Sequence, residues 1–203
     1  MKSEIITGQQ FTVGGNMDIN DVLTIATSRA ETKFQTELGA ARKELKEAET
    51  DLAKANKTLT QAIQKQSEDL GERHAAAIRE GIKAMGGKVE VEAKSALWQE
   101  KVCATVKILT GNNYSNGSFS LEEKPNAGVV SATEMRDRAQ EAKTRAEETA
   151  MEWKKKLNNI PTLERRMKAK LAEAKLRDSE EGLAMLNAIT DNLDKEMLAL
   201  PGF

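Results

Sequence analysis

The most regular feature of the chain is a repeat of apolar positions every seven residues in its first half. Leucine recurs at Leu38, Leu45, Leu52 and Leu59, and an alanine follows each of them three residues later. This spacing places the apolar residues on one face of a helix and is typical of a coiled-coil seam. The pattern predicts a long helix over residues 21–85, and a glycine pair directly after it predicts its end.

A second seven-residue repeat covers the last third of the chain. Ser131 and Glu134 fit a capping box, in which the two side chains bond to free backbone amides, so they predict the start of this helix. Pro161 has no amide donor and its ring clashes with the preceding turn, so it predicts a kink between helices over 131–159 and 161–198. The seam residues are Ala146, Trp153, Ile160, Met167 and Ala174 at one position and Ala150, Leu157 and Leu171 at the other, where Glu164 interrupts the series.

The pattern changes to a period of two between the two helical stretches. Residues 88–92 and 102–108 alternate polar and apolar and are rich in valine, which predicts two half-buried strands. Asn116-Gly117 is a strong hairpin-turn signal, and residues 118–121 then form the returning strand. Residues 93–100 form either a short helix or an extended link.

These patterns predict a mainly α chain, in which a long antiparallel helical (coiled-coil) hairpin carries a small β-hairpin or β-sheet head between its arms. The first arm covers 17–87, the head 88–128, and the second arm 129–203 with a kink at Pro161. Residues 1–16 form an N-terminal tail or an edge strand. The alternative is a compact bundle, in which the glycine and proline breaks fold the arms back on themselves.

A two-helix hairpin buries only one narrow stripe, whereas the predicted seams are long and regular. We therefore expect self-association, most simply as a homodimer. The seam residues expected in this association are Leu38, Leu45, Leu52, Leu59, Trp153, Leu157, Ile160, Met167 and Leu171.

The composition supports long helices and excludes some other classes. Charged residues make up 31% of the chain and aromatic residues 3%, with a net charge of -1. Such a composition is typical of coiled coils. No apolar run approaches the roughly 18 residues that a membrane span needs. The first residues lack the basic and apolar segments of a secretory signal. We expect a cytoplasmic protein.

The chain offers little for catalysis or metal binding. It contains one cysteine, Cys103, and one histidine, His74. A structural zinc site needs four ligands, and a nucleophilic cysteine needs a neighbouring base or a lowered pKa. We expect no catalytic, cofactor-binding or metal site, and no enzyme activity.

Residues 154–177 carry the one strong charge asymmetry, with nine basic and two acidic residues. Such a stretch fits phosphates or an acidic protein face. The alternative is neutralisation by acidic residues of the other arm, such as Glu44 and Asp51. The candidate contacts are Lys154, Lys155, Arg165, Arg166, Lys168 and Lys170.

Three of the seven aromatic residues lie in the predicted head. These are Trp98, Tyr114 and Phe119, and Asn116 belongs to the same segment. Exposed aromatic residues anchor protein partners, so these four form the candidate partner-binding surface. The alternative is that the aromatic residues form the core of the head.

These features favour a non-enzymatic interaction protein, acting as an adaptor, an assembly scaffold or a steric inhibitor that binds another protein. Nucleic-acid binding through residues 154–177 is an alternative, and it predicts an affinity that falls steeply with salt.

The order of helix, β segments and helix resembles prefoldin in outline. That resemblance implies a β platform and coiled-coil tips that hold unfolded clients, which makes a holding chaperone the other alternative. It predicts exposed apolar side chains at the arm ends, near Leu23 and Leu198. The arms of this chain are long for that family, and Pro161 departs from its pattern.

Overall fold

The structure is a computed structural model. It describes residues 19–110, 114–174, 181, 184 and 188. The predicted tail over residues 1–16 and the predicted helix beyond residue 174 therefore lie outside the described residues.

The described chain is mainly helical, with a small antiparallel sheet between helices in chain order, as the sequence predicted. The sheet has the strand order β1-β2-β3. No described helix is both long enough and apolar enough to cross a membrane. The elements are α1 (Ile19–Ala84), β1 (Gly87–Ala93), β2 (Val102–Thr110), β3 (Tyr114–Glu123), α2 (Ala127–Asn158) and α3 (Ile160–Ala174).

The chain divides into two compact units. One unit consists of residues 44–146, and the other of residues 1–43 and 147–203. Helices α1 and α2 contribute to both. The unit of residues 44–146 contains the whole sheet, and we call it the sheet unit.

Helix α1 is continuous over 66 residues and ends where the glycine pair predicted. The amide of Gly86 donates to the carbonyl of Lys83 at 3.0 Å, and Gly86 has a φ of 76°. Glycine adopts this left-handed conformation at little cost, so it closes a helix efficiently. The chain then enters β1 directly.

Helix α2 begins four residues before the predicted capping box, so that prediction was wrong. The side chain of Asn126 supplies the cap, because its Oδ1 accepts from the amide of Val129 at 3.0 Å. Asparagine at this position satisfies one of the free amides of the first turn. Ser131 and Glu134 lie inside the helix.

The helical break near Pro161 is confirmed. Helix α2 ends at Asn158, and α3 begins at Ile160. The carbonyl of Asn159 accepts from the amide of Leu163 at 3.0 Å and so opens α3. Pro161 therefore lies in the first turn of a helix, where its missing amide costs nothing.

The predicted strands are confirmed, and residues 94–101 between the first two form a link without a helix, whereas Ala93 ends β1. The predicted turn at Asn116-Gly117 was wrong, because both residues lie inside β3. Gly117 pairs with Ile108 and Ser115 pairs with Leu109, so Asn116 is the extra residue of a β-bulge. Glycine is common at such irregularities.

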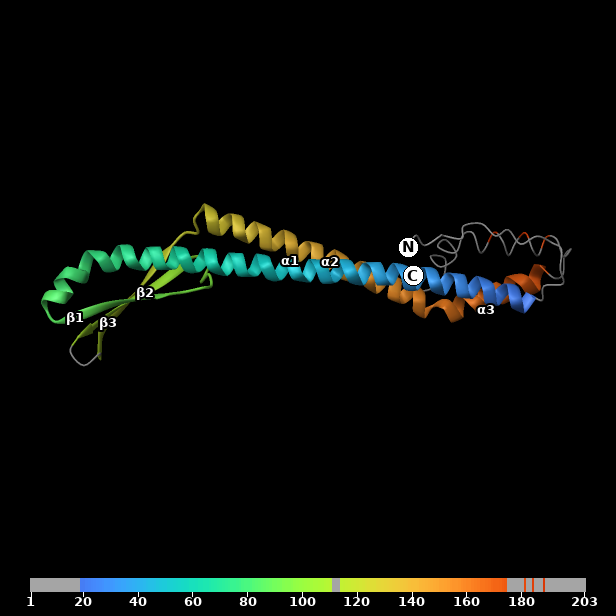
Figure 1. Cartoon of the computed structure of the whole chain (residues 1–203), viewed down its shortest axis with the longest axis horizontal. Helices are drawn as coiled ribbons and strands as arrows, with labels where there is room; N and C mark the ends of the chain where they lie inside the picture. Colours follow the sequence, from blue (N-terminus) through green and yellow to red (C-terminus); the bar gives the residue numbers. More distant parts are fainter. Residues whose placement is uncertain (1–18, 111–113, 175–180, 182–183, 185–187, 189–203) are drawn as a thin grey trace, which may run out of the picture. The chain divides into compact units, whose positions relative to one another are not determined.

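The sheet packs one face against α1 in the sheet unit, as Figure 1 shows. Ile63 of α1, Val102 of β2 and Val129 of α2 form a buried cluster, with Leu97 of the link packed against it. Helix α1 and the sheet come very close at Gly71, where an added Cβ would lie 2.2 Å from Cγ1 of Val91.

The other unit has its own buried residues. The ring centroids of Phe34 in α1 and Trp153 in α2 lie 6.0 Å apart. Lys156 is buried, and its Nζ lies 4.1 Å from the centroid of the Trp153 ring. The same Nζ forms an ion pair with Oε1 of Glu152 at 3.0 Å. The largest fully buried side chains here are Phe34, Leu163 and Met167.

Candidate functional site

The two faces of the sheet differ in what covers them. Along β2, Val102, Ala104 and Val106 are fully buried, whereas Cys103 and Thr105 between them are half-buried. Successive side chains of a strand point to opposite faces, and directly paired residues share a face. We call the face that carries Cys103 and Thr105 the outer face. The register places Glu92, Ser120 and Glu122 on it as well.

A groove of about 450 Å³ lies on the outer face. Its floor comes from the side chains of β2 and β3, and one wall comes from the link between β1 and β2. The lining residues are Lys94, Ser95, Ala96, Leu97, Trp98, Cys103, Thr105, Ser120 and Glu122.

A tight turn at the end of the link presents Trp98. The amide of Trp98 donates to the carbonyl of Lys101, and the amide of Lys101 donates to the carbonyl of Trp98, both at 2.9 Å. The two residues between them, Gln99 and Glu100, have φ values of 48° and 61°. Two left-handed residues are the signature of a type I′ turn, which normally uses asparagine and glycine. Here neither residue is glycine, so the turn is strained, and such strain concentrates at functional sites.

Trp98 is 65% exposed although it is one of the largest apolar side chains in the protein. Its backbone is fixed by the turn, and its ring lines the groove. A rigid aromatic side chain that stays in water is a typical anchor for a protein partner.

Ion pairs surround the groove. Lys101 pairs with Glu122 at 2.6 Å, and Lys107 pairs with Glu92 at 2.7 Å. Lys94 also bonds to Glu92. Hydrogen bonds from Lys107 and Lys94 lower the pKa of Glu92 to about 2, and the bond to Glu92 raises the pKa of Lys107. The bond to Glu122 likewise raises the pKa of Lys101.

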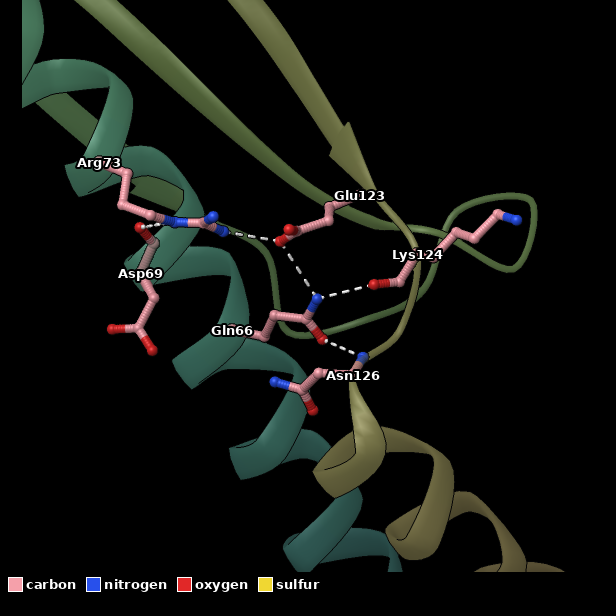
Figure 2. A network of polar contacts seen from close by, with 6 residues as sticks. All are labelled: Gln66, Asp69, Arg73, Glu123, Lys124 and Asn126. Atoms are coloured by element: carbon pink, nitrogen blue, oxygen red, sulfur yellow. Dashed lines mark hydrogen bonds and ion pairs between the residues drawn. The ribbon is translucent and has the colours of Figure 1, made fainter.

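A network around Gln66 of α1 holds the end of β3 and the start of α2 (Figure 2). Nε2 of Gln66 donates to the carbonyl of Lys124 at 2.8 Å and to the carboxylate of Glu123 at 3.3 Å. Its Oε1 accepts from the amide of Asn126 at 2.9 Å. Arg73 pairs with Glu123 at 2.8 Å. The bonds from Gln66 and Arg73 lower the pKa of Glu123. This side of α1 thus fixes where the third strand ends.

Ser67, the next residue of α1, holds the link that carries Trp98. Its hydroxyl is fully buried, donates to the carbonyl of Cys103 and accepts from the amide of Lys94 at 2.8 Å. The groove therefore has a rigid base, because both its floor and its wall are bonded to one helix.

The structure separates the aromatic residues that the sequence grouped. Trp98 lines the groove on the outer face, whereas Phe119 pairs with Val106 and so lies on the face toward α1, where it is 38% exposed. One partner surface therefore does not hold both residues. Tyr114 and Asn116 lie in β3, and their side chains are outside the described ones.

The basic candidates lie on α2 and α3. Lys154, Lys155 and Arg165 are exposed, and Arg166 is half-buried. Lys168 pairs with Glu164 at 2.7 Å. The side chain of Lys170 is outside the described ones.

The seam residues differ in burial. Leu38 and Met167 are buried within the chain. The side chain of Leu171 is outside the described ones. The half-buried members are Leu45, Leu52, Leu59, Trp153, Leu157 and Ile160. At the arm end, Leu23 is buried, and Leu198 lies outside the described residues.

Sequence reasoning missed most of the groove. Gln99-Glu100 carries no turn signal, so nothing marked Trp98 as the residue at a tight turn. Thr105, Ser120 and Glu122 become neighbours only through the strand register. The alternation along β2 was the one available signal, because it already assigns Cys103 and Thr105 to the same face.

No group of three or more histidine, cysteine, aspartate or glutamate residues is placed to hold a metal ion within the described ranges. Comparison of the chain with protein-family models, with curated proteins and with solved structures finds no match.

Proposed function

We propose that this chain is a non-enzymatic interaction protein, which binds another protein through the outer face of its sheet. The observation that carries the proposal is Trp98, a 65% exposed tryptophan held at a strained, non-glycine turn beside a groove. The helices serve as the rigid support of this surface.

The energetics favour a covered Trp98. An aromatic side chain buries about 150–250 Å² in a protein interior. Covering the exposed part of Trp98 would therefore contribute about 2–4 kcal/mol at 25 cal/mol per Å². That range is typical of the residues that dominate a protein interface.

The chemistry of the groove favours binding over catalysis. No histidine is among the residues that line it, and the one histidine of the chain, His74, lies on α1. Serine, threonine and cysteine need a base to act as nucleophiles. The charged residues of the groove, Lys94 and Glu122, are instead engaged in ion pairs.

The test is capture of partners from extract of the source by the tagged full chain, with and without nuclease. We expect one protein in a fixed ratio to the bait, unaffected by nuclease. Trp98→Ala should lower its recovery at least tenfold, because a central aromatic anchor is lost.

Met85→Ala is the matched control, because Met85 is 72% exposed but does not line the groove. It should leave recovery unchanged. Equal recovery with wild type and Trp98→Ala would contradict the proposal. Loss of the captured material with nuclease would favour nucleic acid, and a broad set of unfolded clients would favour the chaperone alternative.

A further inference from the structure

We infer that the groove beside Trp98 accepts one large apolar side chain, aromatic or long aliphatic, that projects from the partner protein. This inference rests on the proposed function and specifies what the partner presents. Three properties of the groove carry it: its size, its walls and its charge.

The size of the groove fits a side chain and its flanking backbone. Pockets for small organic molecules occupy about 300–1,000 Å³, and this groove of about 450 Å³ lies near the lower end of that range. It is too small to receive a whole helix or strand. A single anchoring residue with its neighbours is the protein element that matches it.

The walls of the groove are mainly apolar. Ala96, Leu97, Trp98 and Cys103 are among the residues that line it. An aromatic ring prefers to stack on or meet the edge of another ring, and aliphatic groups pack against its face. Ser95 and Ser120 also line the groove, and serine hydroxyls can bond to the backbone of a bound segment.

The charge of the groove argues against a charged occupant. Lys94 and Glu122 line it, and each already has an opposite charge, Glu92 and Lys101 respectively. A carboxylate, an ammonium group or a phosphate would compete with these existing pairs and would lose part of its own hydration in the groove. A neutral apolar side chain needs neither change, so it is the complementary ligand.

Cys103 allows a direct test, because it is the only cysteine in the chain and it lines the groove. The full chain is incubated with a pool of small disulfides that share one linker and end in phenyl, indolyl, isobutyl, carboxylate or ammonium groups. The Cys103 thiolate attacks a disulfide sulfur, a new protein–fragment disulfide forms, and the other half leaves as a thiol. Excess 2-mercaptoethanol keeps the exchange at equilibrium, and mass spectrometry of the intact protein reports the adducts.

We expect the phenyl, indolyl and isobutyl adducts to exceed the carboxylate and ammonium adducts at least tenfold. Trp98→Ala should abolish this preference, Trp98→Phe should keep it, and Met85→Ala should leave it unchanged. A preference for charged fragments, equal capture of all fragments, or no adduct at all would overturn the inference. So would an apolar preference that survives Trp98→Ala.

The two failures remain distinguishable. If the captured partner depends on Trp98 but the fragments show no apolar preference, the proposed function stands and this inference fails. If the fragments show the preference but no partner depends on Trp98, the groove binds apolar groups and the proposed function fails.

Discussion

Gly71 shows how one residue sets the distance between α1 and the sheet. An added Cβ there would lie 2.2 Å from Cγ1 of Val91, whereas an added Cβ at Gly81 of the same helix meets nothing within 4 Å. Sequence alone treats the two glycines alike, because both only weaken a helix. The two positions differ because α1 packs on the sheet at Gly71 and not at Gly81, and no local sequence pattern encodes that packing.

The two glycines should therefore respond in opposite directions to alanine. Gly71→Ala gains about 1 kcal/mol of helix propensity but overpacks the contact with Val91 by more, so we expect a net loss of about 1–2 kcal/mol. Gly81→Ala should gain about 0.5–1 kcal/mol. Urea unfolding of the full chain followed by circular dichroism measures both, and stabilisation by both substitutions would contradict the packing at Gly71.

Gln66 is the residue on which the end of the sheet depends. Gln66→Met keeps the volume but leaves the carbonyl of Lys124 and the amide of Asn126 without their partner, at a cost of about 1–3 kcal/mol. Gln64→Met is the control, because Gln64 is exposed and its side-chain amide donates to Glu68, one turn further along α1. It should change the free energy of unfolding by less than about 0.5 kcal/mol. Equal changes in the free energy of unfolding for Gln66→Met and Gln64→Met would show that the Gln66 network does not stabilise the fold.

At the scale of elements, the turn at Gln99-Glu100 predicts a stabilising double substitution. Gln99→Asn with Glu100→Gly suits a type I′ turn and should raise the free energy of unfolding by about 1 kcal/mol, as left-handed strain is relieved. Gln99→Ala with Glu100→Ala removes the same side chains and keeps the strain, so it should not stabilise. Thermal unfolding of the three proteins gives the comparison, and equal melting temperatures for all three would contradict the strained turn.

The ion pairs of the outer face predict acid sensitivity of the sheet. The pKa of Glu92 is about 2 in the folded protein against its ordinary 4.5, so the folded state binds fewer protons between these values. The stabilisation by ionised Glu92 is therefore fully present above pH 4.5, and it is lost as the pH falls toward 2. Glu92→Gln should flatten this part of the stability profile. Urea midpoints between pH 6 and pH 2.5 test this, and parallel profiles for wild type and Glu92→Gln would refute it.

The elements with a strong period were predictable, and those fixed by long-range pairing were not. The seven-residue repeat predicted α1, and the alternation of polar and apolar residues predicted β1 and β2. Each repeat arises because one face of the helix or strand is buried. The cap at Asn126 was missed because Ser131 and Glu134 offered an equally good local signal. Asn116-Gly117 was misassigned because a bulge and a turn both use asparagine and glycine.

Trp98 is the only residue of the candidate site that the sequence analysis selected. Trp98 stood out as an aromatic residue in the head, but Phe119 stood out equally, and only the register separates their faces. The strain at Gln99 and Glu100, which distinguishes the Trp98 turn, has no signature in those two amino acids. The groove is a property of the folded sheet unit.

At the scale of the whole molecule, the half-buried seam predicts self-association. Leu45, Leu52 and Leu59 keep part of their surface exposed in the single chain. Light scattering after size exclusion should give about twice the 22.3 kDa of one chain. Leu52→Gln should lower this mass by weakening the seam, and Lys57→Gln on the exposed side of α1 should not. A single-chain mass at all concentrations would contradict the predicted dimer.

The central claim is that the outer face of the sheet binds a partner protein, and adjacent residues of β3 test it most directly. A photoreactive benzoylphenylalanine replaces Ser120, which lines the groove, or Phe119, which lies on the opposite face. Each protein is irradiated in extract of the source, and cross-linked products are identified by mass spectrometry. We predict one partner protein cross-linked from position 120 and none from position 119. Cross-linking from position 119 alone, or equally from both positions, would contradict this account.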